Sequence, residues 1–255
     1  MLQLGRCDIV TYMRQKLIIS FILNNGISVL SLVALLSYVI VILVSIISHE
    51  VAHGYVAYLN GDPTAKLSGR LTLNPAKHLT LAGTLMMFLV GFGWAKPVPI
   101  DSRNFKDYKK GMITTSLAGV TLNFIYALLS SICLAILLLC TKNVVFYSKN
   151  FAFYAYAFGY YLFYFSMMVN VTLMVFNLLP IYPLDGFRVV ETLSSPDSKF
   201  VDFMYRYGSF VLLAFIIISY GLSYLGVPSL FAMVQQLTAT IFDKLWGAIM
   251  GVALI

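Results

Sequence analysis

Charged side chains are scarce in this 255-residue chain, since only 11% of its residues are Asp, Glu, Lys or Arg while 60% are hydrophobic. A soluble domain carries about 25% charged residues, so that class is excluded. Cysteine is also scarce, and the three present form neither a C-x-x-C pair nor an even set, which argues against a disulfide framework. The net charge of +7 comes from Lys and Arg in short loops beside apolar runs, so we expect no nucleic-acid partner. The composition predicts a polytopic membrane protein.

The apolar runs predict an all-α fold with about four to six transmembrane helices. Full spans are expected over 27–59, 112–140, 151–179 and 207–225, and residues 228–255 form either a fifth span or an amphipathic segment.

Other stretches are too short or too polar to cross a bilayer. Residues 79–92 are apolar over only about fourteen positions and run into Gly and Pro, which favours a re-entrant element. Residues 1–25 are expected to form an interfacial segment, 71–73 a short strand and 185–206 a polar loop. Asn60-Gly61 is expected to end the first span.

Histidine and glutamate are rare, with three and two copies, and the pentapeptide His49-Glu50-Val51-Ala52-His53 holds two of the histidines and one glutamate. Residues four apart on a helix share a face, so both imidazoles can bind one metal ion with Glu50 beside them. Ionisable groups inside a span are costly and usually functional. The motif therefore predicts a zinc site at the end of the first span.

A catalytic zinc takes three protein ligands and keeps one position open for water. Pro180 and Pro183 end the third span, and Asp185-Gly186 follows. We expect this broken helix to bring Asp185 back to the zinc as the third ligand. His78 is the competing candidate, and a plain surface turn is the structural alternative.

The chemistry of such a site assigns further roles. Glu50 is expected to act as general base, taking a proton from the water that zinc activates and returning it to the leaving nitrogen. Asn123 is an isolated amide in an apolar span, so it is either an oxyanion donor or an interhelical hydrogen-bonding residue. The loops after residues 53, 99 and 185 are basic, which predicts a cytoplasmic membrane location with the site nearer the cytoplasmic face.

Four motifs between Ser48 and Arg188 carry a family resemblance. HEVAH and NLLPIYPLDG, with GRLTLNPAKH and FGWAKPVP between them, resemble the site-2 protease family of intramembrane zinc metalloproteases, and most of all its short bacterial type without a PDZ or CBS domain. The chain departs from the family pattern at Val120, where proline is usual, and at Thr80 and Leu81, where an aspartate and a proline are frequent.

The resemblance implies that His49, His53 and Asp185 bind zinc and that Glu50 is the catalytic base. It also implies that Asn123 and Asn177 lie near the substrate. The departures affect the local shape of the cleft and leave the proposed ligands and base unchanged.

These observations predict a single integral-membrane metalloprotease domain over 1–255. It would comprise the interfacial segment 1–25, a catalytic core over 27–188 and C-terminal helices over 207–255. Its expected activity is zinc-dependent hydrolysis of peptide bonds within or next to transmembrane segments. The partners would be single-pass or other transmembrane proteins and the lipid bilayer, with self-association left open. A zinc-dependent membrane hydrolase of a non-protein substrate and an inactive metal-binding scaffold remain the alternatives.

Overall fold

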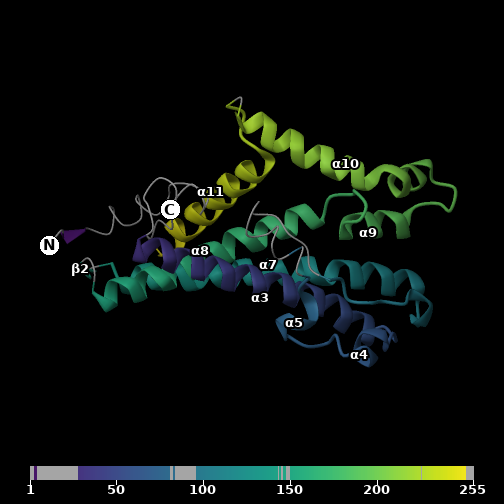
Figure 1. Ribbon diagram of the computed structural model, residues 1–255, viewed down its shortest axis with the longest axis horizontal. Coiled ribbons are helices and arrows are strands. Elements are labelled where there is room, and N and C mark those ends of the chain that lie inside the picture. Colours follow the sequence, from purple (N-terminus) through teal and green to yellow (C-terminus); the bar gives the residue numbers. More distant parts are fainter. Residues whose placement is uncertain are drawn as a thin grey trace. The chain divides into compact units, whose positions relative to one another are not determined.

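The computed structural model describes residues 3–4, 28–80, 83, 96–142, 144, 146–147, 150–224 and 226–250. Its long helices are α3 (Val29–Leu59), α7 (Tyr108–Cys140), α8 (Phe151–Asn177), α10 (Lys199–Tyr224) and α11 (Leu230–Met250) (Figure 1). Its short elements are α4 (Thr64–Leu67), α5 (Pro75–His78), the 3-10 helix η1 (Ser102–Asn104), α9 (Asp185–Leu193), and the strands β1 (Gln3–Leu4) and β2 (Phe146–Tyr147). The two strands pair antiparallel, with Gln3 opposite Tyr147.

Four of the described helices are long and apolar enough to cross a membrane, namely α3, α7, α8 and the Lys199–Ser219 part of α10. At about 1.5 Å per residue, the 27 to 33 residues of the first three exceed the ~30 Å hydrocarbon core. The chain is therefore an all-α, multi-pass membrane protein, as predicted. Within the described residues α11 is not among these spans, and the choice between a fifth span and an amphipathic segment for residues 228–255 stays a prediction.

Contacts divide the chain into two compact units. The first unit comprises Met1–Ile42, Tyr126–Val171 and Gln235–Ile255. Its core is rich in aromatic residues from α8, where the rings of Tyr160 and Tyr164 stack with centroids 5.8 Å apart. These tyrosines therefore pack in the protein interior, as is usual for aromatic residues deep within a span.

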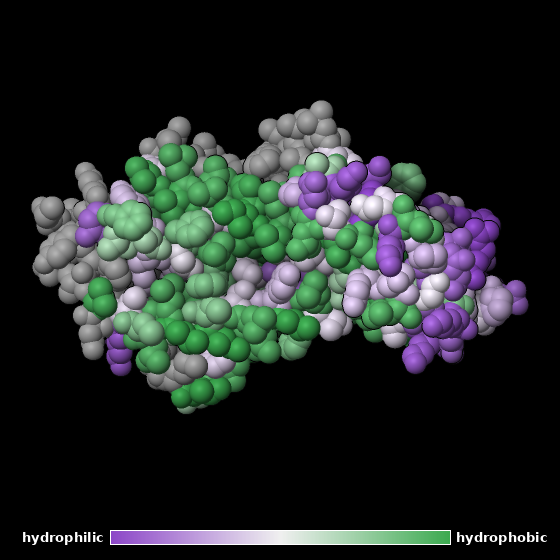
Figure 2. All heavy atoms as spheres, turned by 90° about the horizontal axis from the view of Figure 1, so that it is seen from below, coloured by the Kyte–Doolittle hydropathy of each residue, from purple (hydrophilic) through white to green (hydrophobic). Residues whose placement is uncertain are grey.

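The second unit comprises Leu43–Ile125 and Thr172–Val234 and holds every predicted metal ligand. Figure 2 shows hydrophilic residues gathered at the end of this unit where α4 and α9 lie. A fully buried carboxylate, Asp62, ties the loops there together. It accepts hydrogen bonds from the backbone N–H of Thr64 (3.0 Å), from that of Asp101 (2.8 Å) and from Asn104 Nδ2 (2.9 Å).

In the first loop, the predicted end of α3 is confirmed and the predicted short strand is not. Helix α3 ends where Asn60-Gly61 predicted, and Gly61 has the left-handed φ of 110° that favours glycine. Asn74 caps α5 by accepting the N–H of Ala76 at 3.1 Å. The strand expected over 71–73 is wrong, because Leu71 and Thr72 form a bend and Leu73 has no regular structure.

The polar loop expected over 185–206 is also wrong. It contains α9 and the first residues of α10. Asp185 lies in the first turn of α9, where its negative charge suits the positive end of the helix. Because aspartate is equally common in turns, the sequence alone suggested a loop at this point. Most of the interfacial segment 1–25 and most of the re-entrant element 79–92 lie outside the described residues. The single domain over 1–255 stays a prediction.

Candidate metal centre

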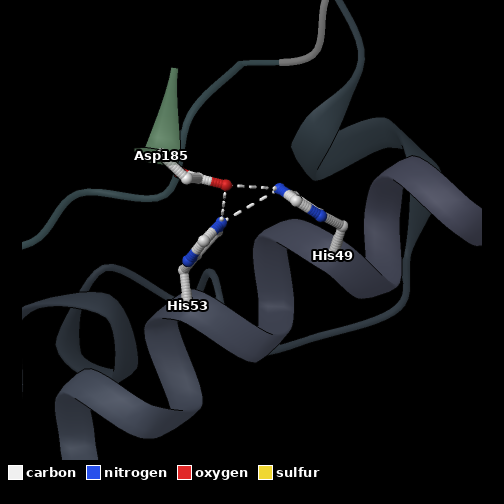
Figure 3. Close-up of side chains that lie close together, drawn as sticks. All are labelled: His49, His53 and Asp185. Carbon is white, nitrogen blue, oxygen red and sulfur yellow. Dashed lines mark hydrogen bonds and ion pairs between the residues drawn. The ribbon is translucent and has the colours of Figure 1, made fainter. Parts of the chain in front are cut away.

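The two motif histidines lie on one face of α3, as their spacing predicts. His49 and His53 are each 7% exposed, and their Nε2 atoms are 3.0 Å apart. Figure 3 shows both rings rising from consecutive turns of α3 towards the same point. The helix therefore presents two buried nitrogen ligands to one small volume.

Asp185 comes to the same point from the chain that follows α8. Its Oδ2 atom lies 3.2 Å from the Nε2 atom of His49 and 3.2 Å from that of His53 (Figure 3). Gly186 permits this return, because a Cβ there would lie 2.5 Å from the carbonyl carbon of Leu178 and 2.7 Å from the oxygen of Leu179. The start of α9 thus packs directly on the backbone that ends α8.

The three ligand atoms fit a tetrahedral zinc ion. Zinc binds histidine nitrogen and carboxylate oxygen at ~2.0–2.2 Å, and tetrahedral angles then separate two ligand atoms by about 3.3 Å. The observed separations of 3.0, 3.2 and 3.2 Å are close to this value. Asp185 Oδ2 is buried and accepts no hydrogen bond within the described part of the chain, so a metal ion would supply its partner. His49, His53 and Asp185 could therefore hold a metal ion, and their two nitrogen atoms and one oxygen atom match the ligand set of a catalytic site.

The far side of each ring also has a partner. His53 Nδ1 lies 2.7 Å from the carbonyl oxygen of Thr115 on α7, which requires the proton on Nδ1 and leaves Nε2 free to bind metal. His49 Nδ1 lies 3.2 Å from the Asn123 amide, also on α7. An amide turned so that Oδ1 faces Nδ1 would hold His49 in the same tautomer.

Gly119 lies one helical turn before Asn123 and gives the His49 ring its space. A Cβ at Gly119 would lie 2.5 Å from Nδ1 and 2.6 Å from Nε2 of that ring. Gly119 and Asn123 are four residues apart and therefore share one face of α7. This face fits against His49 both sterically and by hydrogen bonding.

Asn123 itself is completely buried, and its described contact is with His49. This contact joins α7 to α3, so it matches the interhelical hydrogen bond that was one of the two roles expected for Asn123. It would also orient the His49 ring. The oxyanion role stays a prediction.

Glu50 is half-buried on α3, beside the histidines. Its Oε2 atom accepts the backbone N–H of Val98 at 3.0 Å. Val98 belongs to a segment with no helix or strand, residues 96–100, and its side chain comes close to α3 at Gly54. The carboxylate predicted as the general base is thus held by a backbone donor from a distant part of the chain.

His78 lies apart from the metal centre and is completely buried in the first loop. Its Nε2 atom is 2.8 Å from the carbonyl oxygen of Thr72. The structure brings Asp185, and not His78, to the two histidines.

Sequence reasoning missed three contacts around the site. The Thr115 carbonyl and the Val98 N–H are backbone groups, which no residue pattern marks. Gly119 was not singled out from the sequence as a site residue, although its i, i+4 relation to Asn123 is a readable signal that the two share a face.

The chain is similar to one peptidase family over most of its length. The family model described as peptidase family M50 matches residues 37–217, a range that contains all three ligand candidates. The chain is also 39% identical over 158 residues to the Bacillus subtilis (strain 168) protein named "Putative zinc metalloprotease YwhC", which covers 62% of this chain and 69% of that relative. No solved structure matches.

Proposed function

Because the chain belongs to peptidase family M50, and is therefore a zinc metalloprotease with several membrane spans, we propose that it hydrolyses peptide bonds within or next to transmembrane segments of membrane proteins. One observation carries this proposal. At about 1.5 Å per residue, Glu50 lies roughly 14 Å before the end of α3 at Leu59, a helix long and apolar enough to span the bilayer.

His49, His53 and Asp185 would hold the zinc ion. When bound, zinc lowers the pKa of a water molecule towards neutrality and polarises a carbonyl group. Thr115 keeps the His53 ring in the tautomer that offers Nε2, and Asn123 would do the same for His49 with its amide turned so that Oδ1 faces Nδ1. The depth and burial of these groups support chemistry performed below the membrane surface.

Glu50 acts as the general base in this proposal. It accepts a proton from the attacking water and delivers it to the leaving nitrogen, so one carboxylate serves both half-reactions. The N–H of Val98 holds Oε2 at 3.0 Å, which leaves the other carboxylate oxygen for the proton transfer. Asn123 remains the proposed oxyanion donor, although its contact with His49 favours the orienting role.

A transmembrane substrate must unwind locally, because a helix engages its own carbonyl groups in hydrogen bonds. We therefore propose that weak helices containing Gly or Asn are preferred. Pairing of such a segment with an enzyme strand would need free backbone groups. In the segment 96–100, the polar groups of residues 96 and 97 and the N–H of Val98 already have partners inside the protein. Strand pairing would therefore have to use Val98 O and the residues after it.

Basic residues support a cytoplasmic orientation of this end of the protein. Five lysines of the second unit lie in a loop, in a short helix or in the first turn of a long one, namely Lys66, Lys77, Lys106, Lys109 and Lys199. By the positive-inside rule we propose that the metal centre faces the cytoplasm from within the cytoplasmic membrane. Self-association stays a prediction.

The decisive experiment surveys membrane-protein fragments in cells that carry the wild type or Glu50→Gln. Glu191→Gln, which changes the chain's only other glutamate, is the matched control. We expect fragments that end inside transmembrane segments with the wild type and the control, and about 10²- to 10⁴-fold less of them with Glu50→Gln.

The outcomes separate the alternatives. Identical fragment sets for all three proteins under several growth conditions would refute intramembrane proteolysis. If zinc were still bound and lipid or small-molecule composition changed with Glu50→Gln, the hydrolase of a non-protein substrate would replace it. If neither the fragments nor the lipid and small-molecule composition changed with Glu50→Gln, an inactive metal-binding scaffold would replace the protease.

A further inference from the structure

We propose that Arg70 is a positioning residue for Glu50, acting through the backbone of residues 96–98. The proposal rests on the general-base function proposed for Glu50. It starts from a guanidinium group that is buried far along the chain from the catalytic carboxylate.

Arg70 is 7% exposed, and one of its nitrogens, Nη2, donates to two carbonyl groups, Lys96 O at 2.6 Å and Pro97 O at 3.2 Å. Within the described residues it forms no ion pair, and its Nε atom has no hydrogen-bond partner. Burying an unpaired cation is costly. The buried Arg70 side chain is placed where it can hold two consecutive peptide groups, those of Lys96 and Pro97.

The fixed peptides lead directly to the catalytic carboxylate. Val98 follows Pro97, and its N–H donates to Glu50 Oε2 at 3.0 Å. Pro97 and Pro99 lack an N–H and have a restricted φ, so they stiffen the segment and leave Val98 as its only amide donor between Lys96 and Ile100. A displacement at Pro97 therefore moves the amide that donates to Glu50 in the described structure.

His78 holds the same segment from a second point. Its carbonyl oxygen accepts the N–H of Lys96 at 2.6 Å, and its buried ring is fixed on Thr72 O at 2.8 Å. The stretch from Arg70 to His78 thus grips residues 96 and 97 through both their carbonyl groups and an N–H. This assigns a positioning role to the chain's third histidine, which within the described residues is not part of the cluster of His49, His53 and Asp185.

Gly54 allows the segment to come near enough to Glu50. It lies one turn after Glu50 on α3, and a Cβ there would be 2.8 Å from Val98 Cγ1 and 2.8 Å from Leu71 Cδ2. Leu71 is the residue after Arg70, so the positioning stretch and the positioned segment meet α3 at the same glycine.

Loss of the two hydrogen bonds from Arg70 should reduce turnover and leave metal binding intact. Arg70 has no described contact with His49, His53 or Asp185. A catalytic group displaced by about 1 Å can cost roughly 100-fold in rate. The expected signature is therefore a lower kcat with KM and zinc content unchanged.

The test compares Arg70→Met and Arg70→Lys in the full-length, zinc-loaded protein in detergent. Arg103→Met is the matched control, because that arginine is exposed and pairs with Asp101. The measurements are zinc per chain, amide hydrogen exchange over residues 96–100, and kcat and KM for a fusion protein whose single transmembrane segment contains Asn and Gly. Glu50→Ala is included for the exchange measurement.

For Arg70→Met we expect exchange at Val98 at least about tenfold faster, wild-type zinc content, kcat about 10- to 100-fold lower and KM within about twofold. Arg70→Lys should recover part of the kcat, since one ammonium can still donate to both carbonyl groups. Glu50→Ala should accelerate exchange at Val98 alone. Arg103→Met should match the wild type.

Unchanged exchange at Val98 in Arg70→Met would overturn the proposal. So would a joint loss of zinc and folded protein in both Arg70 variants, which would indicate a purely structural role. Exchange and zinc content need no substrate. If the wild type cleaves nothing while Arg70→Met still frees the Val98 amide, the protease function fails and the positioning role stands.

Discussion

Gly119→Ala is the sharpest probe of the metal centre, because it adds a single methyl group against one ligand. The new Cβ would lie 2.5 Å from Nδ1 and 2.6 Å from Nε2 of His49. Comfortable contact between such atoms begins at about 3.5 Å, so the ring must retreat by about 1 Å. Gly119 is buried within α7, and His49 lies on the neighbouring span α3, so neither helix can yield without disturbing the packing around it.

A shift of this size is large for a metal ligand. Workable sites keep ligand distances within about 0.2 Å of their ideal values. Even the loss of an outer hydrogen-bonding partner typically lowers metal affinity 10- to 100-fold. We therefore expect Gly119→Ala to weaken zinc binding by more than about 100-fold, or roughly 2.8 kcal/mol, and to abolish proteolysis.

Gly159→Ala provides the matched control. Gly159 is also a glycine within a membrane-spanning helix, α8, but a Cβ there would meet only Leu137 Cδ2, at 3.5 Å. Alanine is the better helix former by about 1 kcal/mol at either position, so helix propensity alone predicts no loss of stability. Zinc per chain would be measured by mass spectrometry after dialysis against buffered zinc, together with thermal unfolding. Wild-type zinc content and proteolysis in Gly119→Ala would refute the assignment of His49 as a ligand packed against this glycine.

Two further predictions follow from the loops. Gly186→Ala should lower zinc content and activity together, because its Cβ would lie 2.5 Å from the carbonyl carbon of Leu178 and would push Asp185 away from the histidines; full zinc occupancy would contradict this. Burial raises the pKa of Asp62, but the hydrogen bonds that it accepts lower it further, so its pKa in the folded protein lies below the usual range. The stabilisation is present above the unfolded pKa of about 3.9 and is lost as pH falls through the folded value. Asp62→Asn should therefore be less stable than the wild type by about 1.5–3 kcal/mol at pH 7, with a gap that closes in acid; a gap constant with pH in thermal unfolding would exclude the charge as its origin.

The cluster of His49, His53 and Asp185 could be predicted from the sequence because local rules bring these candidate ligands together. Two histidines four residues apart must share a helix face, and an apolar span makes an idle polar cluster expensive. Asp185 needed one further argument, that two prolines end the preceding helix and a catalytic zinc wants a third ligand. That argument also left His78 open, since nothing in the sequence says which loop turns back.

The contacts that hold Glu50 could not be predicted in this way. Val98 is 48 positions from Glu50, and Arg70 is 26 positions from Lys96. Both contacts use backbone groups, which every residue carries, so the pattern of side chains along the sequence does not indicate them. The same limit explains the missed α9, where Asp185-Gly186 is compatible with a turn and with a helix start, and only packing on Leu178 decides between them.

Three glycines show how closely the elements of this site approach one another. A Cβ would strike Val98 at Gly54, the ring of His49 at Gly119 and the backbone of Leu178 at Gly186. In membranes, where the hydrophobic effect does not drive helices together, small residues let backbones come into contact. Here the contacts that they allow involve the proposed base, one candidate ligand and the turn that carries another candidate ligand. The polar motif supplies the chemistry, and residues with no side chain set the distances at which that chemistry can work.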